Sequence, residues 1–291
     1  MASSQFSSYQ SQSIDTTPEV DQFLMQAFCQ MPVWKKARLV NESTRGIQQW
    51  ALVGVYNQYP NATPAEIRYQ LAIRCLGKEI ANQLYRDGQA RIVDAESINL
   101  TLKIAEILES LAVPYLIGGS IASSILGEPR ATLDVDVVAD LQLSHVQPLT
   151  ALMASEFYID EKMILEAIEH QSSFNVIHLD TMQKVDIFIL SDKPLAQIEM
   201  QRRQQLVIIQ NPKRSAWFAS AEDIILQKLI WYRMGDRISD RQWRDVLGVL
   251  KVQGEQLDFN YLAQWGERLN LTDLLTQAMQ ASGTNTTLPS I

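Results

Sequence analysis

The spacing of apolar residues divides this chain into two parts. From Glu19 to about Asp87, apolar residues recur every three or four positions, which predicts helices and no strands. We expect one helix over residues 18–31 and a longer one over residues 32–60. From Ile98 onward, runs that alternate with period two lie between helical segments. The first part is therefore predicted to be all-helical, and the second to hold a sheet.

A third N-terminal helix carries its own start signal. Thr63 stands at an N-cap position, Pro64 follows at the first helical position, and Glu66 completes the spacing of a capping box. We expect this helix to end near Gly77 and to be followed by a last short helix. The charged, glycine-containing stretch over residues 86–97 is predicted to be the linker to the second part.

The second part begins with a helix over residues 98–112, a strand and turn in VPYLIGG, and a short helix in SIASSILG. The stretch LDVDVVADL alternates with period two, which predicts a strand. Two later runs, SFNVIHLDT and KVDIFIL, are expected to pair as a hairpin. The remaining elements are expected in this order: helices over 144–156 and 160–169 before the hairpin, a strand over 204–210 after it, and helices over 220–253 and 258–280.

These patterns predict an α+β fold with a mixed β-sheet core, a helical C-terminal cap and an all-α N-terminal domain. The polar start of the chain has too few apolar residues to fold and is expected to be disordered. The expected divisions are a tail over residues 1–17, a helical domain over 18–88, an α/β core over 98–215, a helical subdomain over 216–282 and a tail over 283–291.

Composition narrows the class of protein. The chain has 291 residues, of which 46% are hydrophobic, so it can bury a sizeable core. Its formal charge is 25 − 33 = −8, which argues against a protein that coats duplex nucleic acid. Cys29 and Cys75 have no Cys or His partner at metal spacing, and the start of the chain lacks the pattern of a secretory signal. No stretch approaches the roughly 20 apolar residues of a membrane span, so we expect a cytoplasmic protein without membrane contact.

The turn after the first predicted strand has chemistry that suits a phosphate group. Gly118 and Gly119 allow backbone angles closed to other residues and let a ligand approach the main chain. Ser120 starts a helix whose free N–H groups and dipole favour an anion. The same three residues are also compatible with a plain tight turn that ends in a serine N-cap.

Three aspartates follow on predicted strands. Asp134 and Asp136 share one face of their strand because they are two residues apart, so both could bind one hard cation such as Mg²⁺. The alternative is two exposed strand residues. Asp186 interrupts the apolar run KVDIFIL, where a buried carboxylate needs a partner, and a shared metal ion would supply one.

Three carboxylates beside a phosphate-binding turn predict phosphoryl or nucleotidyl transfer. In two-metal chemistry, one ion lowers the pKa of the attacking hydroxyl, and both ions clamp the reacting phosphorus and the leaving pyrophosphate. We therefore expect an enzyme, dependent on Mg²⁺ or Mn²⁺, that transfers a phosphoryl or a nucleotidyl group.

Residues 117–137, IGGSIASSILGEPRATLDVDV, resemble the signature of the DNA polymerase β-like nucleotidyltransferase superfamily. The segment KVDIFIL is similar to the strand that carries the third aspartate of that superfamily. The resemblance covers about residues 98–280 and implies a nucleotidyltransferase-type mixed sheet. It also implies an enzyme that moves a nucleoside monophosphate from a nucleoside triphosphate to an acceptor hydroxyl and releases pyrophosphate. It assigns Gly119 and Ser120 to phosphate, Asp134, Asp136 and Asp186 to metal, and Lys228 to the triphosphate or the polar network of the site.

Residues 220–250 are similar to the helix pair of the nucleotidyltransferase toxins found in bacterial abortive-infection systems, and this resemblance implies a site role for Asp245. The chain departs from that group at Gly248, where a second aspartate is expected, which weakens both the role of Asp245 and the toxin label. Residues 31–85 resemble a small uncharacterised bacterial helical family. That resemblance implies a helical regulator or adaptor joined to an enzyme.

Two basic residues have open interpretations. Arg130 is a candidate contact for nucleotide phosphates, against the alternative of a plain surface loop. Lys228 lies on the same helical face as Ile224 and Ile225, so its stem could instead run along the core.

Other classes of function remain to be separated. The string Asp134-Val135-Asp136 also resembles the nucleophile motif of haloacid-dehalogenase-type phosphatases, but EPRAT precedes it where a long buried strand is needed, and the glycine turn would have no task. A further alternative is a catalytically silent nucleotide-sensing or partner-binding module of a toxin–antitoxin-like pair. The sequence does not choose the nucleotide, nor the acceptor among RNA such as tRNA, a protein and a small molecule.

Overall fold

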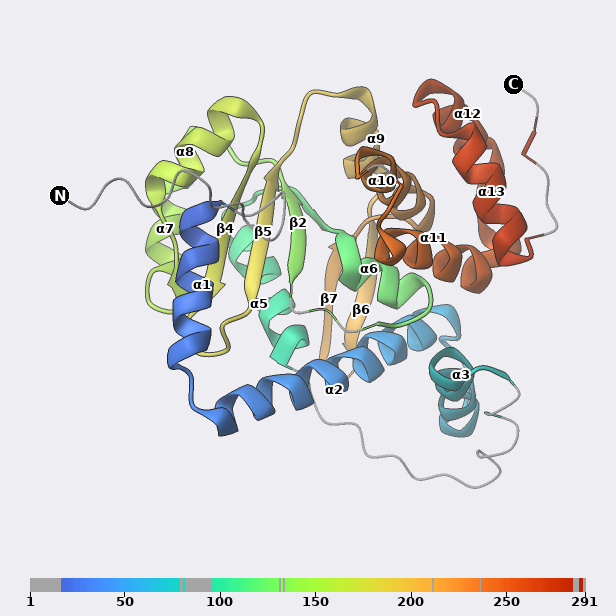
Figure 1. The fold of residues 1–291 in the computed structure, drawn as a ribbon, viewed down its shortest axis with the longest axis horizontal. Helices are drawn as coiled ribbons and strands as arrows, with labels where there is room; N and C mark the ends of the chain where they lie inside the picture. Colours follow the sequence, from blue (N-terminus) through green and yellow to red (C-terminus); the bar gives the residue numbers. More distant parts are fainter. Residues whose placement is uncertain are drawn as a thin grey trace.

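A seven-stranded mixed sheet forms the centre of the molecule and is flanked by helices (Figure 1). The computed structural model describes residues 17–78, 81, 96–130, 132, 134–210, 212–235, 237–284 and 288–289. The strand order is β3-β4-β5-β2-β1-β7-β6, which confirms the predicted mixed-sheet core. The strands are β1 (Tyr115–Ile117), β2 (Val135–Ala139), β3 (Phe157–Tyr158), β4 (Ser173–His178), β5 (Lys184–Ile189), β6 (Gln204–Gln210) and β7 (Lys213–Phe218).

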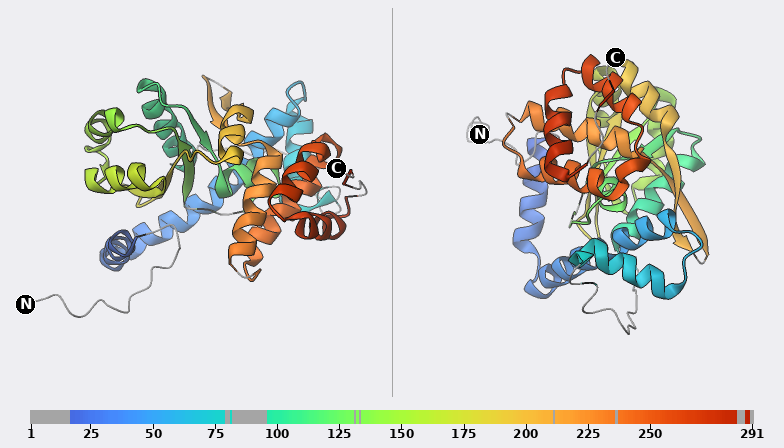
Figure 2. Two further views of the ribbon diagram at one scale, coloured as in Figure 1. Left: turned by 90° about the horizontal axis from the view of Figure 1, so that it is seen from above. Right: turned by 90° about the vertical axis from the view of Figure 1, so that its right-hand side faces the viewer.

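Helices pack on both ends of this sheet. Figures 1 and 2 place α7 and α8 at the end formed by β3 and β4, and the C-terminal helices α10 to α13 at the other end. The helices are α1 (Pro18–Gln30), α2 (Val33–Gln58), α3 (Pro64–Leu76), α5 (Glu96–Ser110), α6 (Gly119–Leu126), α7 (Val146–Met153), α8 (Glu161–His170), α9 (Pro194–Arg202), α10 (Ala221–Met234), α11 (Asp240–Gln253), α12 (Phe259–Arg268) and α13 (Thr272–Ser282).

The short strand β1 joins two halves of the sheet. It pairs antiparallel with β2 on one side and parallel with β7 on the other. Strand β2 runs parallel to β5, which brings the two aspartate strands side by side. The predicted hairpin of β4 and β5 is confirmed, because these strands pair antiparallel.

Most predicted elements are confirmed, including the capping box, in which Thr63 and Glu66 bond each other's backbone N–H groups at the start of α3. Three elements were not predicted: β3, α9 and β7. Strand β7 has the sequence KRSAWF, whose charged start hides its alternation, and it is fixed by pairing with β6 and β1 rather than by its own pattern. The helix expected over 144–156 is shorter, because a 3₁₀ turn at Leu143–His145 precedes α7.

The N-terminal helices pack directly against the sheet part of the chain. The Asn57 side chain of α2 donates to the carbonyl of Val207 at 2.7 Å and accepts from its N–H group at 3.0 Å, on strand β6. Arg74 of α3 donates to the carbonyl of Ile125 near the end of α6 at 2.7 Å. The main hydrophobic core also continues from Trp50 of α2 through the strands to Leu275 of α13. The domain boundaries drawn from the sequence stay predictions.

Some expectations lie outside the described residues. They are the tail over residues 1–16, most of the short helix after Gly77, the linker up to residue 95 and most of the C-terminal tail. Within the described part of the chain, no helix combines the length and apolar character needed to cross a membrane.

Candidate active site

The glycine turn lies directly against the aspartate strand. Gly119 opens α6 with a φ of +56°, and a Cβ atom at this position would lie 1.7 Å from Oδ2 of Asp136. The backbone N–H of Ser120 points to the same oxygen at 3.4 Å, and the N–H of Gly118 bonds the Asp136 carbonyl at 2.9 Å. Only glycine at position 119 permits this approach, so the turn and Asp136 form one structural unit.

A polar row crosses three strands at the level of this turn. Asp136 is paired with Asp186 in the parallel register of β2 and β5, and Asp186 is paired with Asn175 in the antiparallel register of β4 and β5. Residues opposite each other on neighbouring strands share a face of the sheet. The structure therefore brings Asp136 and Asp186 together, beside the turn at Gly118.

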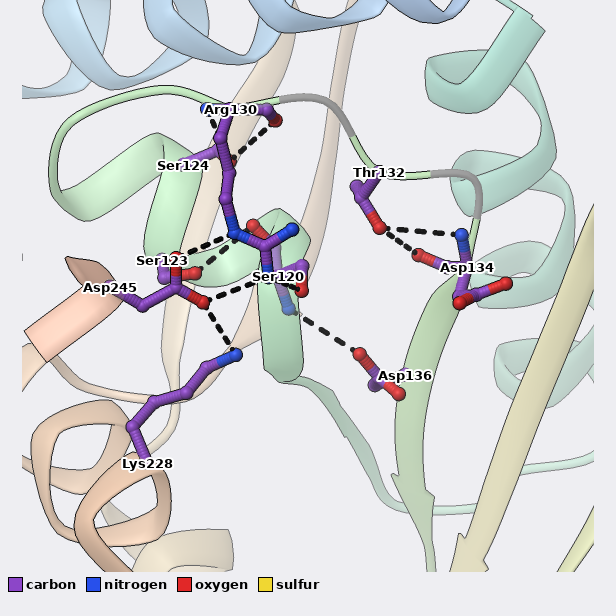
Figure 3. Close-up of polar contacts among 9 residues, drawn as sticks. All are labelled: Ser120, Ser123, Ser124, Arg130, Thr132, Asp134, Asp136, Lys228 and Asp245. Atoms are coloured by element: carbon purple, nitrogen blue, oxygen red, sulfur yellow. Dashed lines mark hydrogen bonds and ion pairs between the residues drawn. The ribbon is translucent and has the colours of Figure 1, made fainter. Parts of the chain in front are cut away.

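Asp134 lies just before β2 and is exposed to solvent. A small turn precedes it, in which the Thr132 hydroxyl bonds the N–H of Asp134 at 3.3 Å and its carbonyl at 3.2 Å. Because strand side chains alternate, Asp134 belongs to the same face as Asp136. Figure 3 shows both residues along the start of this strand, with Asp136 pointing toward Ser120.

Asp186 is buried, with 1% of its surface exposed. The ammonium of Lys184 lies 2.8 Å from its Oδ2 atom, and the Asn175 amide donates to its Oδ1 atom. Lys184 is also buried, since only 7% of its side chain is exposed. The carboxylate of Asp186 is therefore held between a cation and an amide of its own protein.

The carboxylates of this face differ in their fit to a metal ion. Among the described residues, no group of three or more His, Cys, Asp and Glu side chains is placed to hold one. Asp134 and Asp136 nonetheless offer the hard oxygen ligands that Mg²⁺ prefers, at the edge of the glycine turn. The donor chemistry of this pair fits the ion, whereas a three-aspartate ligand set that includes Asp186 stays a prediction.

Two cations meet one carboxylate on the other side of the turn (Figure 3). Arg130 donates to both oxygens of Asp245, from Nε at 2.6 Å and from its terminal nitrogen at 2.9 Å. Lys228 lies 2.7 Å from Oδ2 of the same carboxylate. Burial acts to raise the pKa of Asp245, but the Arg130 hydrogen bonds and the charge of Lys228 outweigh it and lower that pKa below its ordinary value.

Through Asp245, Arg130 also links helices α10 and α11 to the turn. Arg130 donates to the hydroxyl of Ser120, and its backbone N–H and carbonyl bond the Ser124 hydroxyl at 3.3 and 3.2 Å. The loop after α6 is thereby fixed on α6 itself. As a result, Arg130, Lys228 and the start of α6 form one connected network, with Asp245 at its centre.

The packing of α11 against the end of α6 explains why position 248 holds a glycine and not a second aspartate. A Cβ atom there would lie 2.9 Å from the backbone nitrogen of Glu128, and one on Gly127 would lie 2.6 Å from that of Val249. The end of α6 and helix α11 thus touch through two glycines. A second aspartate at position 248 would push this contact apart.

Sequence reasoning missed two residues of the site, Lys184 and Asn175. The signal for Lys184 was present, because it lies two residues before Asp186 on a strand and so shares its face. Asn175 could not be placed without the register of β4 against β5.

Comparisons with known proteins give little beyond general shape. No protein-family model matches the chain, and no curated protein does. Among solved structures, the chain is similar to an antigenic nucleotidyltransferase-like protein from Paracoccidioides brasiliensis, at 22% identity and a TM-score of 0.42, over 65% of this chain and 93% of that one.

Two antibiotic-modifying proteins are also similar. The antibiotic-resistance factor ANT(2'')-Ia shares 13% identity at a TM-score of 0.38, over 62% of this chain and 97% of that one. The lincosamide antibiotic adenylyltransferase LnuA, in its lincomycin-bound form, shares 14% identity at a TM-score of 0.35, over 52% of this chain and 94% of that one. At these identities and scores the likenesses carry no weight for activity, which has to be argued from the residues of the site.

Proposed function

We propose that the protein is a nucleotidyltransferase that moves a nucleoside monophosphate from a nucleoside triphosphate to an acceptor hydroxyl and releases pyrophosphate. The observation that supports this most is the contact between Gly119 and Asp136, because it places a turn suited to phosphate against a carboxylate suited to a divalent cation. Neither the turn nor the carboxylate alone would indicate this reaction.

The residues around the turn would hold the triphosphate. The dipole of α6 would favour an anion near the start of this helix, while Arg130 and Lys228 add two positive charges against the single charge of Asp245. The excess of one positive charge favours an anionic group at this place. Ser120 keeps the Arg130 guanidinium in position.

The aspartates would act at the phosphates of the nucleotide, where bonds form and break. A Mg²⁺ or Mn²⁺ ion bound at Asp134 and Asp136 would supply charge neutralisation at the phosphates. The acceptor hydroxyl attacks the α-phosphorus and loses its proton to a base of the site, a new P–O bond forms, and the bond to pyrophosphate breaks. Asp186 is proposed as that base or as a further ligand.

The finer parts of the proposal concern the acceptor and the setting. The acceptor is an RNA such as tRNA, a protein or a small molecule, and the nucleotide is any of the four common triphosphates. We extend the proposal to a cytoplasmic enzyme of a bacterial toxin–antitoxin-like pair, in which the N-terminal helices regulate the site. Contacts of Asn57 and Arg74 with β6 and α6 give these helices a physical route to it.

The test is incubation of the purified protein with Mg²⁺ and each α-³²P-labelled triphosphate, alone, with total tRNA and with cell lysate, followed by gel separation. We expect label to reach one class of acceptor and to be lost in Asp134→Asn and Asp136→Asn. The matched control is Asp140→Asn, because Asp140 lies just past the opposite end of β2 and its carboxylate accepts a hydrogen bond from Gln142 instead.

Each result has a definite meaning. Equal labelling by the wild type and by both aspartate variants would contradict the assignment of the site. Absence of label with every triphosphate and acceptor, from a protein that still binds nucleotide, would favour the silent sensing or partner-binding module.

A further inference from the structure

A lysine stands inside the acidic face that the proposed reaction uses. Val135 is paired with Val185, so position 184 of β5 lies beside position 134 of β2. Asp186 is paired with Asp136 in the same register. Lys184 therefore shares one face of the sheet with all three aspartates, because strand side chains alternate with period two.

Its ammonium is also buried and engaged. It lies 2.8 Å from Asp186, in a place where 7% of the lysine side chain and 1% of the aspartate side chain are exposed. Removing two such charges from water costs free energy, and an ion pair is not needed to fill this volume. A pair of apolar residues would pack a strand at least as well, so the charge itself calls for an explanation.

The balance of charges on this face of the sheet supplies an explanation for the buried lysine. Asp134, Asp136 and Asp186 together carry three negative charges on neighbouring positions of β2 and β5, and Lys184 adds one positive charge to the same face. In a two-metal site, the second ion would lie against such carboxylates and do the same. Here the position next to Asp186 already holds a cation that is part of the chain.

We propose that the ammonium of Lys184 takes the place of one of the two metal ions at this site, so that the protein binds a single divalent cation at Asp134 and Asp136. This inference rests on the proposed function. Lys184 is then a positioning residue: it fixes the carboxylate of Asp186 and keeps that carboxylate from binding an ion of its own.

The experiment measures how many Mn²⁺ ions each chain binds, by titration of the purified full-length protein and detection of free Mn²⁺ by electron paramagnetic resonance. The variant is Lys184→Gln, which removes the charge and keeps a hydrogen-bond donor near Asp186. The matched control is Lys103→Gln, because Lys103 pairs with Glu156 on the surface, where 39% and 47% of the two side chains are exposed. Circular dichroism reports whether each variant folds.

We expect one ion per chain in the wild type and in Lys103→Gln, and two in Lys184→Gln. The second ion should be lost when Asp186→Asn is added to Lys184→Gln. That double variant removes both members of the ion pair and should bind one ion like the wild type. The number of ions on the wild type itself keeps the inference testable even when the single variant does not fold. A purely structural lysine would lower stability without raising the number of ions bound.

Other results separate this inference from the proposed function. Two ions on the wild type, or one ion of unchanged affinity on a folded Lys184→Gln variant, would contradict the role of Lys184 alone. Loss of the ion from the double variant would also contradict it, because the wild-type ion would then depend on Asp186. No Mn²⁺ on any of these proteins would overturn the metal assignment of the proposed function as well.

Discussion

Two of the charge clusters in the described part of the molecule have opposite balances of charge. In the candidate site, Arg130 and Lys228 surround the single carboxylate of Asp245. Where α9 packs against the C-terminal cap, one arginine contacts several acids, and we call this group the cap cluster. Arg202 lies 2.9 Å from Glu222 and 3.6 Å from Asp223, and Glu199 lies close enough for its pKa to respond to Asp223. The first cluster has an excess of positive charge, and the second has an excess of negative charge.

The pKa values of the buried acids follow these balances. The pKa of Asp245 is lowered, because the two cations beside it outweigh the effect of burial. Burial, reinforced by the charge of Asp223, raises the pKa of Glu199 to about 8, against an opposing hydrogen bond from Gln227. Burial also raises the pKa of Asp223, although hydrogen bonds from Tyr261 and Ser220 oppose it. The cap cluster therefore holds a proton on Glu199 up to a pH of about 8, whereas the site cluster keeps the carboxylate of Asp245 ionised.

The partners of each cluster explain the difference in role. The acids of the cap are closed off by neutral donors: the Tyr261 hydroxyl on Asp223 at 2.6 Å and the Gln227 amide on Glu199 at 2.7 Å. Arg202 also stacks over the Tyr261 ring at 3.7 Å, which joins α9 to α12. We interpret the cap cluster as structural and the site cluster as the one suited to an anionic ligand, because only the site has cationic charge to spare.

The largest expected effect is that of Asp245→Asn. It leaves Arg130 and Lys228 facing each other without the central carboxylate, and loss of one partner of a buried ion pair costs about 3 kcal/mol of unfolding free energy. Urea unfolding checks this value. The control is Asp273→Asn, whose pair with Arg237 is exposed on both sides and should cost at most about 1 kcal/mol. Equal costs for the two variants would contradict the central place of Asp245.

Gly119→Ala comes next. Its methyl group would collide with Asp136, and a displacement of about 1 Å in a reacting group costs roughly 100-fold in rate. Label transfer should fall by that factor or more. Gly283→Ala is the matched control, since Gly283 also has a positive φ, +75° in the left-handed region, but has nothing within 4 Å of an added Cβ atom. This variant should lose only about 1 kcal/mol of stability through backbone strain and should keep full activity.

Glu199→Gln tests the cap cluster through pH. The raised pKa of Glu199 means that the folded state holds a proton that the unfolded state releases, so the wild type loses stability as the pH rises from about 4.5 to about 8. The glutamine variant imitates the protonated acid. Its free energy of unfolding should match that of the wild type at pH 5 and exceed it at pH 9, where the wild-type carboxyl group is ionised in its buried place. A wild type that loses no more stability than the variant over this range would rule out a stored proton on Glu199.

The site cluster should respond to pH in the opposite direction. A lowered pKa for Asp245 gives stability that is present above the ordinary value of 3.8 and is lost as the pH falls through the folded value. Asp245→Asn should therefore remove part of the acid limb of the stability profile and leave the alkaline limb unchanged. Glu199→Gln should do the reverse.

The smallest effect is expected from Tyr261→Phe. It removes one hydrogen bond to Asp223 and keeps the ring under Arg202, which costs about 1 kcal/mol of unfolding free energy. Label transfer should not change, because this cluster is structural. A loss of transfer without a loss of stability would show that the cap cluster takes part in the reaction.

Sequence patterns were sufficient for the elements that carry their own signal. The capping box at Thr63, the alternation of the Asp134–Asp136 strand and the hairpin of β4 and β5 were all predicted, because local periodicity determines them. Strand β7 was missed because its pairing with two other strands, and not its composition, makes it a strand.

The site followed the same rule. The residues of the turn and the aspartates could be chosen from spacing, but their contacts could not. Arg130 and Asp245 are 115 positions apart, and only the packing of α11 on α6 through Gly127 and Gly248 brings them together. The buried partner of Asp186 depends on the same kind of information, since the burial of Lys184 follows from the strands on both sides of it.

The central claim is that the turn and the aspartates act on the α-phosphate of a nucleoside triphosphate. The most direct measurement is parallel incubation of the protein and its acceptor with α-³²P- and γ-³²P-labelled forms of the preferred nucleotide. The account predicts that only the α label becomes attached to the acceptor and that the γ label is recovered as pyrophosphate. Attachment of the γ label would mean phosphoryl transfer and would contradict the account.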